Sequence, residues 1–302
     1  RANVGGMINN NSAGAHSVKY GKTIDHVIEL EVVLSDGSVC HWGEMTAEDV
    51  REKVEQKNLE GQIFREVVRL SRTHEEEIDI RYPKILRRVG GYNLDAFVSG
   101  KPFNMSRMVV GSEGTLAAVT EAKVNLEPLP NAKALGVIQF DDLIESMRAV
   151  APILETQPAA VELIDKMILD QTKGSIELSK QRAWVEGDPD AVLVVEYYAD
   201  SMDEITPQLD VLEELLHEQG LGYGFRRAVS ADEQNNVWNV RKAGLGLLMG
   251  IIGDAKPVAF VEDSAVSPDL LPEYIDAFER IVRSHNTVAG YYAHASVGLL
   301  HI

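Results

Sequence analysis

Two short glycine-containing segments are the part of this sequence best suited to hold a ligand. The first runs from Gly5 to Gly14 and includes three consecutive asparagines, and the second runs from Gly111 to Thr115. Glycines let a backbone approach a ligand closely, and backbone amides and asparagine side chains donate to phosphate or carbonyl oxygens. Two such turns could clamp one elongated cofactor, although their composition does not name it. An ordinary irregular loop remains the alternative for the first segment.

Four residues of the C-terminal third have side chains that could act on a substrate. Arg241 and Lys256 are cations, and His294 and His301 lie seven residues apart. A planar guanidinium suits a carboxylate because two parallel hydrogen bonds can form. An imidazole can accept a proton near neutral pH or bind a metal. By spacing alone a surface arginine is as typical as a binding site for Arg241, and a core or surface position is more typical than a site for the two histidines.

The composition limits the classes of protein. The chain of 302 residues is long enough for two domains, and its formal net charge is −18. An acidic surface repels phosphate backbones, so we expect no nucleic-acid partner. Cys40 is the only cysteine, which excludes an internal disulfide and a cysteine-ligated iron–sulfur cluster within this chain. No apolar run predicts a transmembrane segment. The phosphate loop, HExxH and GxSxG motifs are also absent from the sequence.

The elements that must position these residues differ between the two halves. Turn-forming residues predict a loop over 1–23, and alternation predicts a strand over 27–34 with a hairpin turn at Asp36-Gly37. Near-helical spacing predicts an amphipathic helix pair from Thr46, as N-cap, to about residue 73. The other elements expected in the first half are a strand over 39–42, a link over 81–104 and a strand over 116–126.

The second half, after a boundary near residue 130, alternates between strands and helices. This pattern predicts an antiparallel sheet covered on one side by helices, which is an α+β layer. The expected strands are 134–140, 161–164, 192–198 and 288–293, and the expected helices are 141–154, 203–219 and 268–284, with Asp141 and Ser267 as N-caps.

The motifs together resemble a known family. Gly5-Gly6-Met7-Ile8 through Asn11 and Gly14, then Tyr20-Gly21-Lys22-Thr23, resembles the FAD-binding domain of the FAD-linked oxidases, the vanillyl-alcohol-oxidase-like superfamily. The branch is that of D-lactate, glycolate and D-2-hydroxyglutarate dehydrogenases. Three further strings are similar to the family: residues 34–37, residues 111–116 in its second flavin-contacting segment, and residues 158–165 in its substrate domain. Arg87 together with residues 91–94 resembles a large subgroup that is fused to an iron–sulfur region.

The resemblance implies an α+β fold in two parts. Residues 1–130 would be the second part of a PCMH-type FAD-binding domain, with a helical insertion at about 45–80. Residues 131–302 would be a truncated C-terminal substrate domain. Because both ends lie in ordered-looking sequence, we expect a fragment of a longer protein. The flavin contacts implied are Gly5, Gly6, Asn10, Asn11, Gly14, Tyr20 and Gly21 from one edge and Gly111, Ser112, Glu113 and Gly114 from the other.

The resemblance also implies a substrate site. Arg241 and Lys256 would hold the substrate carboxylate, and His294 and His301 would be catalytic and would bind a divalent metal such as zinc, iron or manganese. Either histidine could take the hydroxyl proton. The sequence departs from the family pattern at Ala293 and at residues 296–299, which makes a catalytic or structural role for the histidines more secure than metal binding.

The implied function is the FAD-dependent oxidation of a 2-hydroxy acid by hydride transfer to flavin. Electrons would pass to an iron–sulfur region outside this chain, a quinone or an electron carrier. We expect the fragment alone to be inactive, and a cytoplasmic location, with peripheral attachment at the inner membrane left open. One alternative is a non-catalytic binding or assembly module of flavoprotein ancestry. Another is a flavin oxidase of an aldehyde, alcohol or sugar, which would leave two cations unpaired.

Overall fold

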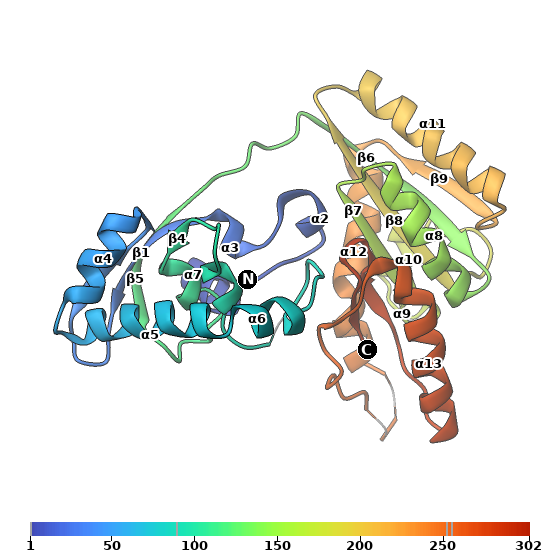
Figure 1. Cartoon of the computed structure of the whole chain (residues 1–302). Helices are drawn as coiled ribbons and strands as arrows, with labels where there is room; N and C mark the ends of the chain where they lie inside the picture. Colours follow the sequence, from blue (N-terminus) through green and yellow to red (C-terminus); the bar gives the residue numbers. More distant parts are fainter. Residues whose placement is uncertain (1, 89, 252, 255) are drawn as a thin grey trace. The chain divides into compact units, whose positions relative to one another are not determined.

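The protein forms two compact units in the computed structural model, which describes residues 2–88, 90–251, 253–254 and 256–302. The first unit comprises residues 1–14, 20–84 and 88–128. The second unit comprises residues 15–19, 85–87 and 129–302. The second unit therefore takes two short segments from the N-terminal half of the sequence. Figure 1 shows the elements of both units.

A three-stranded antiparallel sheet organises the described part of the first unit. Its order is β2-β1-β5, with β1 at Val27–Val33, β2 at Val39–Trp42 and β5 at Ala118–Val124. The predicted hairpin is confirmed, and Gly37 in its turn has φ 84°. Leu30 and Trp42 point into the core of this unit.

The helical region that follows begins as predicted. Thr46 caps α4 (Ala47–Glu55) by accepting from the Asp49 amide at 3.2 Å, and the Asp49 carboxylate reaches back to the Thr46 amide. Helix α5 (Leu59–Thr73) buries Phe64 in the core, because its apolar positions share one face. A third helix, α6 (Glu75–Arg81), lies within the helical insertion expected at about 45–80, although the amphipathic pattern predicted only a pair of helices.

The loop predicted over residues 1–23 is wrong, because α1 (Val4–Asn10), α2 (Ser17–Tyr20) and α3 (Thr23–His26) lie there or begin there. The Asn3 side chain accepts from the Gly6 amide at 2.9 Å, and Asn11 closes α1 in the left-handed conformation. These caps outweigh the low helix propensity of two glycines. The other elements of this unit are β3 (Glu44–Met45), η1 (Leu94–Phe97), β4 (Phe103–Asn104) and α7 (Ser106–Val109).

The described part of the second unit is built on a seven-stranded sheet in which all pairs are antiparallel. The order is β10-β12-β11-β7-β8-β6-β9. The predicted strand over 288–293 is mostly wrong, since β11 begins only at Tyr292. The strands are β6 (Ala132–Phe140), β7 (Ala160–Asp165), β8 (Ala191–Ala199), β9 (Gly224–Ala228), β10 (Ser264–Ala265), β11 (Tyr292–His294) and β12 (Leu299–His301).

Helices cover both faces of this sheet (Figure 1), so the prediction of helices on one side is wrong. The α+β class itself is confirmed. The central strand β7 is buried at every residue, which requires cover on both faces. Helices α8 (Leu143–Glu155), α11 (Met202–Gln219) and α13 (Leu271–Ser284) pack on one face, and α9 (Lys166–Lys173) and α12 (Ala231–Met249) on the other.

Smaller details of the second unit also differ from the sequence expectations. The N-cap of α8 is Asp142, one residue after the predicted Asp141, and it accepts from the Glu145 amide at 2.7 Å. Within the described ranges, no helix combines the length and the hydropathy that a bilayer-spanning segment needs. The remaining elements are α10 (Leu178–Gln181), η2 (Pro268–Leu270) and η3 (Ala295–Val297).

Candidate functional site

Strand register gathers polar side chains on the sheet face that α12 covers. In the antiparallel pairing His294 of β11 lies opposite Glu162 of β7, and Tyr292 lies opposite both Ile164 and His301. Residues directly opposite one another, and residues two apart, share a face. Glu162, His294, Tyr292 and His301 therefore face the same side as the core packed under α12.

Glu162 is the centre of this group. Its side chain is 1% exposed, and its carboxylate lies 2.7 Å from Nη2 of Arg241 and 2.8 Å from Nδ1 of His294. A buried carboxylate is stable only with such partners. Glu162 therefore fixes the positions of an arginine from α12 and a histidine from β11.

Arg241 is held from several sides. Its Nη2 also donates to the Ala293 carbonyl at 3.3 Å, and its Cζ lies 5.0 Å from the centre of the Tyr292 ring. The residue is 8% exposed, and its Nε is buried without a hydrogen-bond partner among the described residues. A buried donor without a partner is costly, so this atom is suited to an incoming carboxylate.

His301 lies in a second group of charges on the neighbouring strand. Its ring stacks on that of Tyr292, with 4.5 Å between the ring centroids. Its Nδ1 lies 2.5 Å from Oε2 of Glu262 and 3.6 Å from Oδ1 of Asp263. Asp263 in turn pairs with buried Arg87 at 3.1 Å. Burial lowers the pKa of His301, which favours the neutral imidazole that a base or a metal ligand requires.

The two histidine rings lie close together, and each is oriented by a carboxylate. Their ring centroids are 5.3 Å apart, edge to face. Nδ1 of each ring meets a carboxylate, Glu162 for His294 and Glu262 for His301. Metal-binding histidines are commonly oriented through one ring nitrogen in this way, so that the other can bind the ion. His301 also belongs, with Glu262 and Asp263, to a group whose possible ligand atoms lie within 4.8 Å of one another, so these side chains could hold a divalent metal.

Lys256, the predicted second cation, is placed differently. It is exposed, and its ammonium donates to the carbonyl of Ile251. Within residues 2–88, 90–251, 253–254 and 256–302, no hydrogen bond or ion pair joins Lys256 to Arg241.

Sequence reasoning missed Glu162, although it singled out the string 158–165 that contains it. It also assigned no role to Arg87, which the structure brings to His301 through Asp263.

The two glycine turns lie side by side in the first unit. The Gly111 amide donates to the Ile8 carbonyl at 2.9 Å, and the Glu113 amide donates to the Asn9 carbonyl at 2.9 Å. The side chain of Asn10 donates to Glu113 at 3.0 Å. Both segments thus contribute to one surface, as a shared ligand would require.

The chemistry of these turns fits a bound cofactor. The hydroxyl of Ser112 is buried and has no partner among the described residues. Gly111 has φ 80° and Gly114 has φ 72°, and the space where Gly5 and Gly14 would carry a Cβ is open. These turns can therefore offer backbone amides and a hydroxyl to FAD. Two other predicted contacts already have structural partners, since Asn11 accepts from the Ile24 amide and the Tyr20 carbonyl meets His26. Gly21, a third, has φ 77°, a left-handed conformation that glycine adopts readily.

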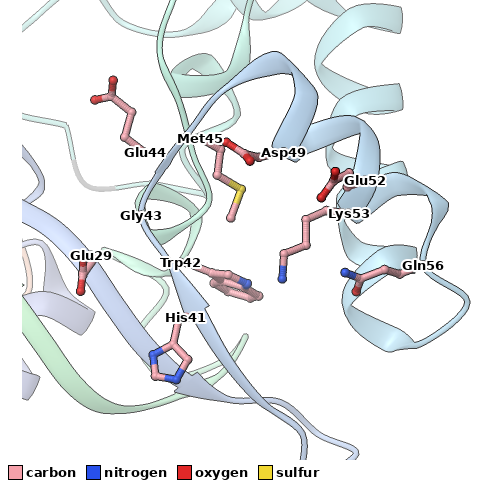
Figure 2. Close-up of a pocket in the computed structure, with 10 residues that line it drawn as sticks. All are labelled: Glu29, His41, Trp42, Gly43, Glu44, Met45, Asp49, Glu52, Lys53 and Gln56. Carbon is pink, nitrogen blue, oxygen red and sulfur yellow. The ribbon is translucent and has the colours of Figure 1, made fainter.

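The first unit also has a cavity of about 390 Å³, away from the turns in sequence (Figure 2). Strands β1 to β3 and helix α4 form its walls. Lys53, which lines it, donates to Glu60 at 2.6 Å, as does the Trp42 ring at 3.0 Å. No predicted site residue lines this cavity. Its lining residues are Glu29, His41, Trp42, Gly43, Glu44, Met45, Asp49, Glu52, Lys53 and Gln56.

Comparison with known proteins relates both parts of the chain to flavoproteins. Residues 129–302 match the family model described as FAD linked oxidases, C-terminal domain, and residues 1–43 match the one described as FAD binding domain. D-2-hydroxyglutarate dehydrogenase of Pantoea ananatis is 32% identical over 100% of this chain and 31% of that protein. Glycolate oxidase subunit GlcD of Bacillus subtilis is 25% identical over 99% of this chain and 51% of that protein. The chain spans about a third of the first relative's length.

Solved structures share the fold. p-Cresol methylhydroxylase with bound substrate superposes with a TM-score of 0.61 at 12% identity, over 98% of this chain and 54% of that one. Alkyldihydroxyacetonephosphate synthase superposes with a TM-score of 0.60 at 14% identity, over 99% of this chain and 49% of that one. The sequence match over residues 129–302 decides the family: this chain belongs to the FAD-linked oxidases.

Proposed function

We propose that the chain is the part of an FAD-dependent dehydrogenase that binds a D-2-hydroxy acid for oxidation to the 2-oxo acid. The relatives named as D-2-hydroxyglutarate dehydrogenase and glycolate oxidase subunit support the substrate class. The observation that carries the proposal is Arg241, a buried guanidinium fixed by Glu162 with Nε unpartnered among the described residues.

Arg241 would bind the carboxylate of the acid. Its position is set before the substrate arrives, since Glu162 and the Ala293 carbonyl already hold Nη2. Preorganisation of this kind lowers the entropic cost of binding and fixes which face of C2 is presented. Lys256 could contribute a second cation only after its segment moves, because its ammonium is bound to the Ile251 carbonyl.

His294 and His301 would act on the hydroxyl group. Held through Nδ1, the two rings could hold a divalent metal that lowers the pKa of the substrate hydroxyl, or one Nε2 could take its proton. The low pKa of His301, caused by burial, keeps a lone pair on this ring for either task.

Both glycine turns would hold the cofactor. When bound, FAD supplies the hydride acceptor for C2 of the substrate. Gly5, Gly6, Asn10, Gly14, Gly111, Ser112, Glu113 and Gly114 would contact it through amides and small side chains, with Asn11, Tyr20 and Gly21 supporting the loop. An iron–sulfur region, a quinone or an electron carrier would then take the electrons.

Anaerobic titration of the flavin-loaded holoprotein tests this function. D-2-Hydroxyglutarate, D-lactate or glycolate should bleach the flavin absorbance, whereas methyl D-lactate and methyl glycolate should not, because these esters have no carboxylate for Arg241. The L-enantiomers of lactate and 2-hydroxyglutarate provide a second control. Failure of every 2-hydroxy acid to reduce the flavin would refute the proposal, and reduction by the ester would refute the role of the carboxylate.

A further inference from the structure

The string at residues 91–94, which the proposed function leaves without a role, contacts the second glycine turn of the first unit, residues 111–115. Asn93 makes the buried part of this contact. Its side-chain amide donates to the carbonyl of Val110 at 2.8 Å and to that of Arg107 at 3.0 Å, and the residue is 9% exposed. Buried carbonyls need such a donor, so Asn93 fixes the backbone that leads directly into the turn.

Tyr92 holds the other end of the turn. Its hydroxyl lies 2.9 Å from Oγ1 of Thr115, which in turn donates to the carbonyl of Ser112 at 2.5 Å. Because Thr115 gives its hydroxyl hydrogen to Ser112, Tyr92 is the donor in the first contact. We call Tyr92 and Asn93 the turn clamp, because they contact the turn at both of its ends.

The turn clamp is itself anchored in the first unit. It is followed directly by η1, whose Ala96 and Phe97 are buried in the core of this unit. Arg88 also pairs with Asp95 at 2.7 Å, which holds the same segment from its outer side. Side chains on an anchored segment can restrain the groups that they contact, as the supporting residues of a binding site must do.

The turn has a conformation that needs such support. Gly111, Glu113 and Gly114 have φ angles of 80°, 53° and 72°. A left-handed backbone is uncommon for a residue with a side chain, such as Glu113, and it persists only where the surrounding structure fixes it. The buried hydroxyl of Ser112, which has no partner among the described residues, belongs to the same turn. Loss of the turn clamp would therefore release the groups that this turn offers to a ligand.

We infer that Tyr92 and Asn93 are positioning residues for the cofactor, which hold residues 111–115 in the conformation that binds FAD. This inference rests on the proposed binding of FAD by that turn. An apoprotein whose turn has this conformation for only part of the time binds FAD more weakly, in proportion to the competent fraction. A purely structural contact would instead stabilise the apoprotein and the holoprotein alike, and would leave the affinity for FAD unchanged.

Titration of the apoprotein with FAD, followed by flavin fluorescence, tests this role. Y92F removes one hydrogen bond and should raise the dissociation constant by about 2–10-fold, and N93L removes two buried ones and should raise it by about 10–100-fold. The increase in melting temperature that a fixed concentration of FAD causes should be smaller in both variants than in the wild type.

Y223F is the matched control, and its dissociation constant should equal that of the wild type. Tyr223 belongs to the second unit and is 45% exposed, against 43% for Tyr92, and its hydroxyl also donates a hydrogen bond, to the carbonyl of Glu186 at 2.7 Å. If N93L does not fold, Y92F still decides the question, because it removes a single oxygen atom from a half-exposed side chain.

Unchanged affinity for FAD in Y92F and N93L would overturn the role of the turn clamp, whether or not the melting temperature of the apoprotein falls. An equal loss of affinity in Y223F would overturn it too. A wild-type apoprotein that binds no FAD would overturn the proposed role of the glycine turns, and the turn clamp with it. A holoprotein that binds FAD but is reduced by no 2-hydroxy acid would instead overturn only the proposed oxidation.

Discussion

Glu162 is the carboxylate on which Arg241 and His294 converge, and the cost of neutralising it can be worked out. E162Q keeps the volume of the side chain but removes the charge that lies 2.7 Å from the guanidinium. Because both side chains are at least nine-tenths buried, Arg241 would become an uncompensated buried cation. Breaking a buried pair in this way costs about 3–5 kcal/mol.

A double-mutant cycle of E162Q and R241Q isolates the pairwise contribution. Urea unfolding should be followed by tryptophan fluorescence in a Trp42→Phe background, because Trp184 and Trp238 then report on the second unit only. We expect each single variant to lose about 3–5 kcal/mol and the double variant to recover a large part of this loss. The exposed i,i+4 pair Arg280–Asp276 is the control, for which D276N should cost about 0.5 kcal/mol or less.

The result that would refute this reasoning is a small coupling. A coupling free energy below about 1 kcal/mol, as for exposed pairs, would mean that Glu162 does not fix Arg241. The guanidinium on which the proposed function depends would then be held only by the Ala293 carbonyl and the Tyr292 ring.

Two further predictions concern a glycine turn and a buried acid. G111A should lower flavin content and the melting temperature of the first unit, because Gly111 has φ 80° and a Cβ there would lie 3.2 Å from Cβ of Asn11. G90A is the control, because the space around Gly90 is open. Equal flavin content in the two variants would contradict the prediction. Burial raises the pKa of Asp165 from 3.8 to about 7, so the native state keeps a proton that the unfolded chain releases. The free energy of unfolding should therefore fall by up to about 4 kcal/mol as pH rises from 4 to 7, and it should level off above pH 7. Urea titrations at several pH values should show a flatter pH dependence for D165N than for the wild type. The same pH dependence in both proteins would refute the raised pKa of Asp165.

The sequence predicts the elements whose signals are local. The hairpin at Gly37 and the capped start of α4 at Thr46 follow from turn and cap residues, which act within a few positions. Helix α12 was missed because its apolar positions are spread round the helix and Gly244, Gly246 and Gly250 argue against a helix.

The site is harder to predict because its contacts are long-range. Family resemblance led to Arg241, His294 and His301, and the structure brings them together. Glu162 could not be found in advance, since its position opposite His294 depends on the register of β7 against β11. Register is a tertiary property, and a shift of one residue would turn the carboxylate to the opposite face.

The central claim is that Arg241 binds the carboxylate of a 2-hydroxy acid, and calorimetric binding of D-2-hydroxyglutarate or its 2-oxo product to wild-type and R241K holoprotein tests it most directly. Lysine keeps a positive charge beside Glu162 but lacks the guanidinium Nε that has no partner among the described residues, so the dissociation constant should rise about 10–100-fold. The ratio of flavin to protein should stay the same. Equal affinity in the two proteins, or a parallel loss of flavin and acid, would contradict the account.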